Sequence, residues 1–185
     1  FVYQLVRPGA RAREYEDAIL WLEQAGLINK VLLSKAPKLP LKAYDDLGTF
    51  KLYTLDLGLL RRLSELDASI LLLPTPAYTE YKGALAENYI LQSLTAQFQM
   101  PFRYWASGNK AEVDFLLQYA NQIYPIEVKA DQNIQGKSLI QYEKLFQPIC
   151  RIRYSMLNLK RDGNLLNIPL FLADKTKALL GVVSD

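Results

Sequence analysis

The stretch that decides the fold spans residues 102–129 and reads FRYWASGNKAEVDFLLQYANQIYPIEVK. Its side chains alternate between apolar and polar with a period of two, which is the pattern of β-strands. We predict a strand over 102–106, a turn over 107–110, a second strand over 111–117 and a third over 123–129. The last two strands form a hairpin whose loop centres on Ala120 and Asn121.

Helices are expected on both sides of these strands. Residues 79–98 place Ala84, Glu87, Leu91, Leu94 and Phe98 on one stripe at helical spacing, so Glu87 falls among apolar side chains. A second amphipathic helix is expected from about Gln135 to Phe146. Strands follow over 149–157 and, after a turn at 161–164, over 166–173. The order predicts an α/β fold, a mixed sheet flanked by helices.

The first part of the chain has its own pattern. A helix over 14–26 stopped by Gly26 precedes two β-like runs, 27–34 and 49–56, joined by a basic loop. A helix followed by such a hairpin predicts a small winged-helix-like segment. A capped helix then begins after Asp56, and Pro74 interrupts the pattern. We therefore expect a winged-helix-like and linking segment at 1–73 and an α/β domain at 79–185.

Composition excludes several kinds of chemistry. The chain has 185 residues, no histidine and a single cysteine, Cys150. An imidazole-based triad, a histidine-ligated zinc site and an intrachain disulfide are excluded. Cys150 lies in an apolar stretch and is expected to be buried and inert.

Charge and hydropathy bear on nucleic-acid binding, on membrane insertion and on the location of the protein. The net charge of +3 arises in residues 1–63, which carry 10 Lys and Arg against 7 Asp and Glu. This excess is too small to indicate nucleic-acid binding by itself. No run approaches the roughly 18 apolar residues of a membrane span. Because the chain begins at Phe1 and has no signal-peptide pattern, we interpret it as a fragment of a longer cytoplasmic protein.

The hairpin carries the candidate chemistry. If its loop centres on Ala120 and Asn121, Asp114 lies opposite Glu127, where two like charges destabilise a sheet. A divalent cation between the two carboxylates would offset this repulsion, because Mg²⁺ is commonly held by one or two carboxylates, waters and substrate phosphate. Lys129 projects on the same side as Glu127. With Glu87 from the preceding helix, this set suits metal-assisted phosphodiester hydrolysis.

A second interpretation of the same residues is a ladder of salt bridges on a half-exposed face. It pairs Glu112 with Lys129, and Glu127 with Lys110 or Lys129. The pattern alone does not decide between the ladder and a metal site.

Three runs resemble a known family: Lys82 to Asn88, Tyr104 to Phe115, and Pro125 to Ala130. They are similar to the C-terminal domain of bacterial and archaeal AAA-type ATPases, which resembles the PD-(D/E)xK nuclease superfamily with its restriction-endonuclease-like core. The family also has a winged-helix-like segment before this domain, and residues 15–28 and 51–59 are similar to it.

The resemblance implies roles for particular residues. Asp114 and Glu127 would hold Mg²⁺ or Mn²⁺, Lys129 would position water, and Glu87 would complete the acidic site. Val113 stands where the superfamily name has proline. The implied partners are DNA and an N-terminal ATPase module; the alternative is a non-catalytic module that docks the ATPase onto a nucleic acid or protein.

Other candidate contacts are weaker. Residues 131–138 end in Gly-Lys-Ser but lack the first glycine of a P-loop, so we expect a helix start and no nucleotide site in this fragment. Tyr104 and Trp105 either stack on a base or pack in the core. Phosphate contacts are expected from basic side chains of the first loop and of one strand, unless these are simply solvated: Lys35, Lys38, Lys42, Arg151 and Arg153.

Overall fold

A computed structural model describes residues 11, 14–65, 76–108, 111–130 and 136–181 of the chain. The first helix, α1 (Glu16–Gln24), ends where expected, because Gly26 adopts the left-handed conformation with a φ of +71°. Ile19 is its buried residue, whereas Leu20 and Trp21 are exposed. The predicted break at Pro74, the Lys110 side chain and residues 131–135 lie outside the described residues.

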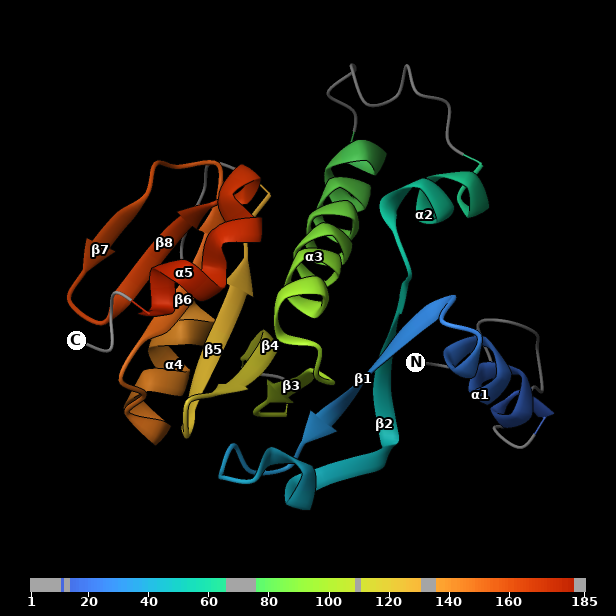
Figure 1. Cartoon of the computed structure of the whole chain (residues 1–185), viewed down its shortest axis with the longest axis horizontal. Helices are drawn as coiled ribbons and strands as arrows, with labels where there is room; N and C mark the ends of the chain where they lie inside the picture. Colours follow the sequence, from blue (N-terminus) through green and yellow to red (C-terminus); the bar gives the residue numbers. More distant parts are fainter. Residues whose placement is uncertain (1–10, 12–13, 66–75, 109–110, 131–135, 182–185) are drawn as a thin grey trace.

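The two N-terminal strands form an antiparallel pair. Strand β1 (Ile28–Ser34) pairs with β2 (Asp45–Thr54), and a 3-10 helix, η3 (Leu41–Tyr44), lies between them. β1 also pairs in parallel with β3 (Arg103–Ala106). The strands assigned from sequence to a winged-helix-like segment thus form one edge of the main sheet (Figure 1). Sequence periodicity is local and does not predict pairing with a strand 70 residues away.

Two helices connect this edge to the centre of the sheet. α2 (Leu57–Leu63) begins as expected at Asp56, whose carboxylate accepts a hydrogen bond from the Leu59 N–H at 2.8 Å. The long helix α3 (Pro76–Phe98) follows. Its buried stripe contains Ala86, Ile90, Leu91 and Leu94, whereas Ala84, expected on that stripe, is exposed.

The central hairpin forms with the expected register. β4 (Glu112–Tyr119) and β5 (Gln122–Val128) pair antiparallel from Phe115 opposite Ile126 to Tyr119 opposite Gln122. Ala120 and Asn121 make the turn with φ of +48° and +59°. Two successive positive φ values match a type I′ turn, whose twist suits a two-residue hairpin loop.

The C-terminal elements complete the sheet. Their order is α4 (Lys137–Phe146), β6 (Arg151–Ser155), β7 (Lys160–Asp162), β8 (Leu165–Pro169), η5 (Leu170–Lys175) and α5 (Thr176–Gly181). The strand predicted over 166–173 is too long, because β8 ends at Pro169 and a 3-10 helix follows. Proline has no N–H to donate to a neighbouring strand, which favours the end of a strand at this position.

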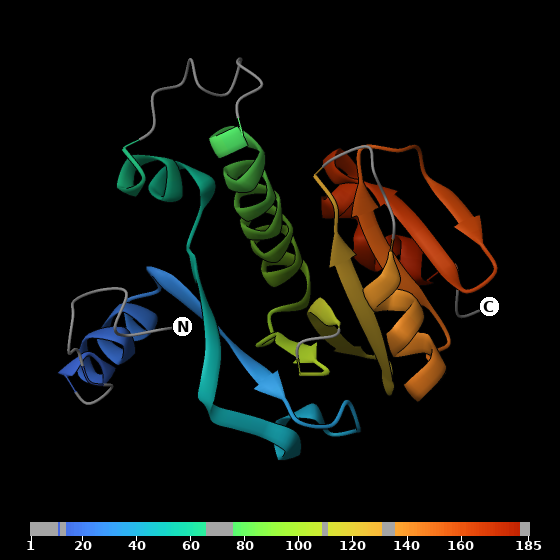
Figure 2. The same cartoon turned by 180° about the vertical axis from the view of Figure 1, so that it is seen from behind.

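The eight strands found among the described residues belong to one mixed sheet with the order β2-β1-β3-β4-β5-β6-β8-β7. The α/β class is therefore confirmed. β5, β6 and β8 run parallel, and α4 connects β5 to β6. Figures 1 and 2 show the sheet from its two sides, with α3 and α5 on one face and α4 on the other.

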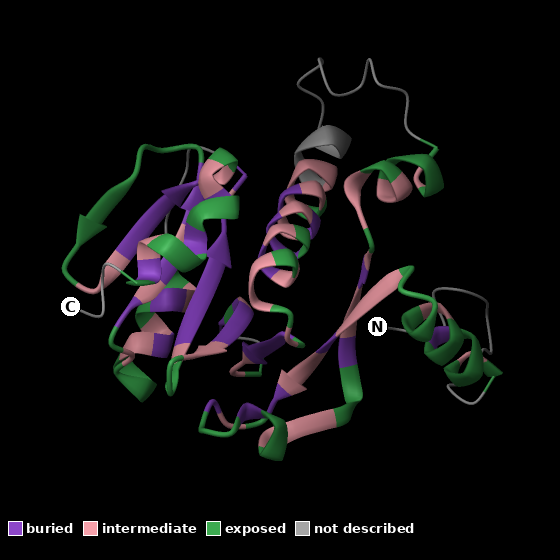
Figure 3. Cartoon of the chain, in the orientation of Figure 1, coloured by how far each residue is buried: buried purple, intermediate pink, exposed green. Residues whose placement is uncertain are grey.

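Each face of the sheet has its own hydrophobic cluster. The α3 face contains Phe115, Leu117 and Ile126 with Ile90 and Leu94, and the α4 face contains Val113 and Leu116 with Leu139 and Tyr142. Burial is concentrated in β4, β5 and β6, whereas β7 and most of α1 are exposed (Figure 3). The centre of the sheet is thus rigidly packed on both sides.

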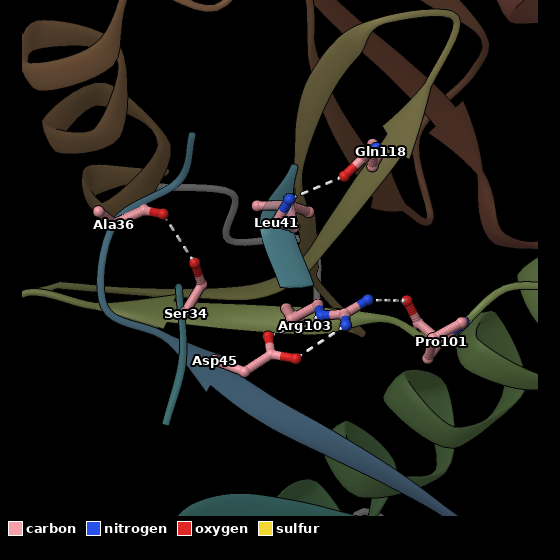
Figure 4. A network of polar contacts seen from close by, with 7 residues as sticks. All are labelled: Ser34, Ala36, Leu41, Asp45, Pro101, Arg103 and Gln118. Atoms are coloured by element: carbon pink, nitrogen blue, oxygen red, sulfur yellow. Dashed lines mark hydrogen bonds and ion pairs between the residues drawn. The ribbon is translucent and has the colours of Figure 1, made fainter. Parts of the chain in front are cut away.

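A buried ion pair ties β3 to the N-terminal hairpin. The Arg103 guanidinium donates two hydrogen bonds to the Asp45 carboxylate, at 2.9 and 2.8 Å, and a third to the carbonyl of Pro101 (Figure 4). The Leu41 N–H donates to the Gln118 side chain at 2.9 Å and links η3 to β4. These contacts fix the position of β1 and β2 relative to the central strands.

Candidate active site

A β-bulge shapes the strand that carries Asp114. Arg103 pairs with Leu116, but Trp105 pairs with Val113, so Asp114 and Phe115 together lie opposite Tyr104. The extra residue interrupts the alternation: Val113 packs on the α4 face and Phe115 on the α3 face. Strict alternation along the predicted strand 111–117 would put Val113 and Phe115 on one face, and the structure shows that this is wrong. Bulges re-aim side chains and are frequent beside active sites.

Asp114 contacts the segment that follows on β5. One carboxylate oxygen accepts a hydrogen bond from the Val128 N–H at 2.7 Å, two residues beyond Ile126 of the last ladder pair. The next residue is bonded to β6, the strand on the other side of β5: the Lys129 N–H donates to the Tyr154 carbonyl at 2.8 Å. Asp114 thus takes the place of a strand partner for Val128, the residue between Glu127 and Lys129.

Glu127 is the most deeply buried acid of the group. Its side chain is 3% exposed, and its Oε1 lies 3.1 Å from the Lys129 Nζ. Oε2 is buried and has no hydrogen-bond partner. An orphaned carboxylate oxygen is costly in a protein interior, so this atom is available for a ligand.

Glu87 is held by the N-terminal hairpin. The Tyr53 hydroxyl on β2 donates a hydrogen bond to the Glu87 Oε2 at 2.8 Å. Burial and the negative charge of Glu87 raise the pKa of Tyr53 well above its ordinary value, so the phenol stays protonated and remains a donor. Glu87 is half-buried, and its charge is felt by Asp114 across the α3 face.

The next residue of α3 fixes this helix to β2. The Asn88 side chain is buried and its Oδ1 accepts hydrogen bonds from the Thr54 N–H at 2.9 Å and the Thr54 hydroxyl at 3.1 Å. Its Nδ2 donates back to the Thr54 carbonyl. Neither Asn88 nor Tyr53 was among the residues predicted for the site.

Lys51 is a further member of the site that sequence reasoning missed. It lies on β2, forms an ion pair with Glu112 on β4, and has its ammonium 5.0 Å from the centre of the Tyr104 ring. Glu112 therefore pairs with Lys51 and not with Lys129 as the ladder interpretation expected. The sequence places Lys51 and Tyr53 on the same side of one predicted strand. It does not indicate which part of the molecule that side would face.

The electrostatics of the site centre on Asp114. Burial raises the pKa of Asp114 to about 7, and the negative charge of Glu87 adds to the rise. The Val128 N–H and the positive charges of Lys51 and Lys129 act in the opposite direction. A carboxyl group that is half protonated near neutral pH gains from any cation that enters the site.

Two acids of the site, Asp114 and Glu127, have the oxygen ligands that a hard divalent cation takes. Asp114 and Glu127 offer carboxylate oxygens, one of them orphaned and buried. No group of three or more acidic or cysteine side chains suited to a metal ion occurs within the ranges that the structure describes. A site of two carboxylates suits Mg²⁺, which retains several waters.

The expected phosphate-contacting residues do not join this cluster. Lys38 and Lys42 are exposed, and Lys35 lies 3.7 Å from Asp46. The Arg151 guanidinium lies 2.9 Å from the Glu143 carboxylate and bonds Asn164, and Arg153 donates to Asn167 at 3.0 Å. Their role in binding phosphate stays a prediction.

Three other features are settled by packing. Trp105 packs edge-on against Tyr142 and Phe146, with ring centres 5.3 and 5.4 Å apart, and Tyr104 is also buried, which favours the core interpretation. Cys150 is free and fully buried, as expected. Gly136 and Lys137 begin α4, which confirms the predicted helix start.

Fold and site together define an α/β domain whose mixed sheet carries a partly buried cluster of carboxylates and lysines. Residues 82–171 match a family described as Domain of unknown function (DUF4143). Residues 1–70 match a second family, Domain of unknown function (DUF8612). Glu87, Asp114, Glu127 and Lys129 lie in the first match, and Lys51 and Tyr53 in the second.

Comparisons with curated proteins and with solved structures found no match. Over the described part of the chain, no helix has the length and apolar character required to cross a membrane.

Proposed function

We propose that the chain carries a metal-dependent nuclease site of the PD-(D/E)xK kind, which hydrolyses or binds DNA and belongs to an ATPase-linked protein. The observation that carries the proposal is the hydrogen bond from the Val128 N–H to Asp114. It holds the aspartate beside the Glu127–Val128–Lys129 segment, where Glu127 has a buried oxygen without a partner. This is the residue set that the resemblance implies.

The order of elements supports the proposal. α3 precedes three antiparallel strands, and α4 then leads to β6, which runs parallel to β5. The restriction-endonuclease-like core implied by the resemblance has the same α-β-β-β-α-β order. A fold does not by itself establish an activity, so the site residues carry the argument.

Each residue has a definite role in this proposal. Asp114 and Glu127 would hold Mg²⁺ or Mn²⁺, which lowers the pKa of water and offsets the charge of the phosphate. The Lys129 side chain is 33% exposed, and its ammonium would leave Glu127 to bind a phosphate oxygen or an attacking water. Glu87, oriented by Tyr53, completes the negative charge of the site.

One observation favours the alternative of a non-catalytic interaction module. Lys129 pairs with Glu127 and Lys51 pairs with Glu112, so lysines already offset two of the acids. A protein that only docks an ATPase onto DNA or a protein would need no metal at these positions.

Metal binding and cleavage decide between the two functions. We would titrate Mg²⁺ and Mn²⁺ into the wild-type chain and into Asp114→Ala by calorimetry, then incubate both with single-stranded and duplex DNA. Asp114→Ala also removes the acceptor of the Val128 N–H, so Asp114→Asn, which keeps an acceptor there, is measured beside it and circular dichroism checks that both variants are folded. The matched control is Asp174→Asn, an exposed acid on η5.

The nuclease proposal predicts that binding and cleavage are lost in Asp114→Ala and kept in Asp174→Asn. A wild-type chain that binds no metal at millimolar concentration would contradict it and favour the interaction module.

A further inference from the structure

Lys51 is a basic residue of the N-terminal hairpin that lies beside the acidic site. Its charge interacts with Glu87 on α3 and with Glu112 and Asp114 on β4, although it lies on β2 at the edge of the sheet. The charges of three carboxylates thus act on one ammonium group, and Glu112 is in direct contact with it. Sheet pairing between Val31 and Lys51 fixes the point from which the side chain starts.

The ammonium group of Lys51 is held in place by an aromatic ring as well as by Glu112. Its ammonium lies over the ring of Tyr104, a buried residue of β3, at 5.0 Å from the ring centre. A cation over an aromatic face gains electrostatic stabilisation from the ring. A preset cation loses less conformational entropy when an anion binds it than a free surface lysine does.

The partner of Lys51 is replaceable. Glu112 is 46% exposed and Lys51 is 25% exposed, whereas Glu127 is 3% exposed. Ion pairs that reach solvent contribute little free energy, so an incoming anion can displace Glu112 at small cost. Lys51 is therefore both accessible and exchangeable, in contrast to the buried Arg103 of the same sheet.

We propose that Lys51 contacts a phosphodiester group of the nucleic-acid strand bound at this site, and that β2 thereby completes a site whose carboxylates lie within 82–171. The inference rests on the proposed function for the identity of the anion. It explains why the segment that matches the second family pairs with the domain through β1 and β3. Glu112 holds the ammonium when the strand is absent.

Two substitutions that break the same ion pair separate this role from a structural one. Lys51→Met and Glu112→Gln both remove the Lys51–Glu112 pair, so a structural role predicts that they act in the same direction. A phosphate contact predicts opposite directions, because the first removes the cation and the second frees it. The double variant shows whether any effect of Glu112→Gln depends on Lys51.

The measurement is the affinity of the full chain for a fluorescent single-stranded oligonucleotide and its duplex, in millimolar Ca²⁺ and over a range of salt. We expect Lys51→Met to weaken binding about tenfold. The slope of log affinity against log salt should fall by about 0.7 for a single strand or 0.9 for a duplex. Glu112→Gln should tighten binding, and this gain should vanish in the double variant. Lys175→Met, an exposed lysine on η5, is the matched control and should behave as wild type.

The inference is overturned if Lys51→Met keeps the wild-type affinity and salt slope, or if both single variants shift binding in the same direction. It is also overturned if the gain from Glu112→Gln persists without Lys51. Failure of the proposed hydrolysis is a separate outcome: a chain that binds DNA through Lys51 but never cuts it in Mg²⁺ contradicts the nuclease and leaves the contact standing.

Discussion

The Asp114 carboxylate accepts a hydrogen bond from the Val128 N–H at 2.7 Å, at the point where the β4–β5 ladder ends. A side chain here replaces the backbone partner that the next ladder step would supply. This side-chain contact depends on the bulge at Asp114 and Phe115. The bulge changes which face each side chain of β4 points to, and the aspartate then points to the face on which α3 packs. The local geometry of one strand therefore creates the acidic site.

Asp114→Asn tests the electrostatic strain at this position. Burial raises the pKa of Asp114 from 3.8 to about 7, so the folded chain binds this proton more tightly than the unfolded chain does. Stability contributed by the group is therefore present below about pH 4 and is lost as the pH rises to about 7. Asparagine cannot ionise and can still accept from Val128.

We expect Asp114→Asn to be more stable than wild type at pH 8, by up to about 4 kcal/mol, and similar at pH 4. Urea unfolding at both pH values measures the difference. Millimolar Mg²⁺ should stabilise the wild type more than the variant, which keeps only the Glu127 carboxylate as a charged ligand. A constant difference across pH would show that Asp114 does not titrate as described.

Tyr53→Phe tests the contact that orients Glu87. The substitution removes the hydroxyl that donates to Glu87 at 2.8 Å and keeps the ring, which packs on Phe115 with centres 5.4 Å apart. We expect a loss of about 1–2 kcal/mol in the free energy of unfolding, because hydrogen bonds to charged groups contribute about that much. Tyr119→Phe, at the far end of β4, is the control and should change stability little. Equal effects of the two substitutions would contradict a specific role for the Tyr53 hydroxyl.

The hairpin register and the helix boundaries could be predicted from the sequence, because neighbouring residues determine them. The two-residue turn at Ala120 and Asn121 fixes the pairing of β4 with β5, so the register from Phe115 opposite Ile126 onward followed from the loop position alone. Helix boundaries followed from Asp56 and Gly26, whose capping roles depend on neighbouring backbone groups. The α/β class and the order of helices and strands were predictable for the same reason.

Long-range pairing and the bulge were not predictable. β1 joins β3 through pairs such as Leu32 opposite Arg103, and no local pattern encodes a partner at that separation. Lys51 and Tyr53 reach the acids only through this pairing. The bulge at Asp114 lacks the glycine that would have marked it, so alternation placed Val113 and Phe115 on one face when they lie on two.

Asn88→Ala tests the attachment of α3 to β2. The side chain is 2% exposed and accepts from both the N–H and the hydroxyl of Thr54. Its loss would leave a partly buried N–H without an acceptor, so we expect the free energy of unfolding to fall by about 2–3 kcal/mol. Gln92→Ala, on the exposed side of the same helix, should remain within about 0.5 kcal/mol of wild type. Chemical denaturation compares the two, and an equally mild effect of both would show that Thr54 is satisfied without Asn88.

Arg103→Met tests the buried ion pair that fixes the N-terminal hairpin. Both side chains of the Arg103–Asp45 pair are about a tenth exposed, at 10% and 9%, and they share two hydrogen bonds. Removing the arginine alone leaves a carboxylate desolvated and unpaired, so we expect a loss of about 3 kcal/mol. The double variant Arg103→Met, Asp45→Leu removes that uncompensated charge and should recover part of the loss. Urea unfolding of wild type, both single variants and the double variant gives the coupling energy, and Lys175→Met, which breaks a solvent-exposed pair with Asp174, should leave stability unchanged. Additive effects of the two single substitutions would show that the pair does not join β3 to β2 energetically.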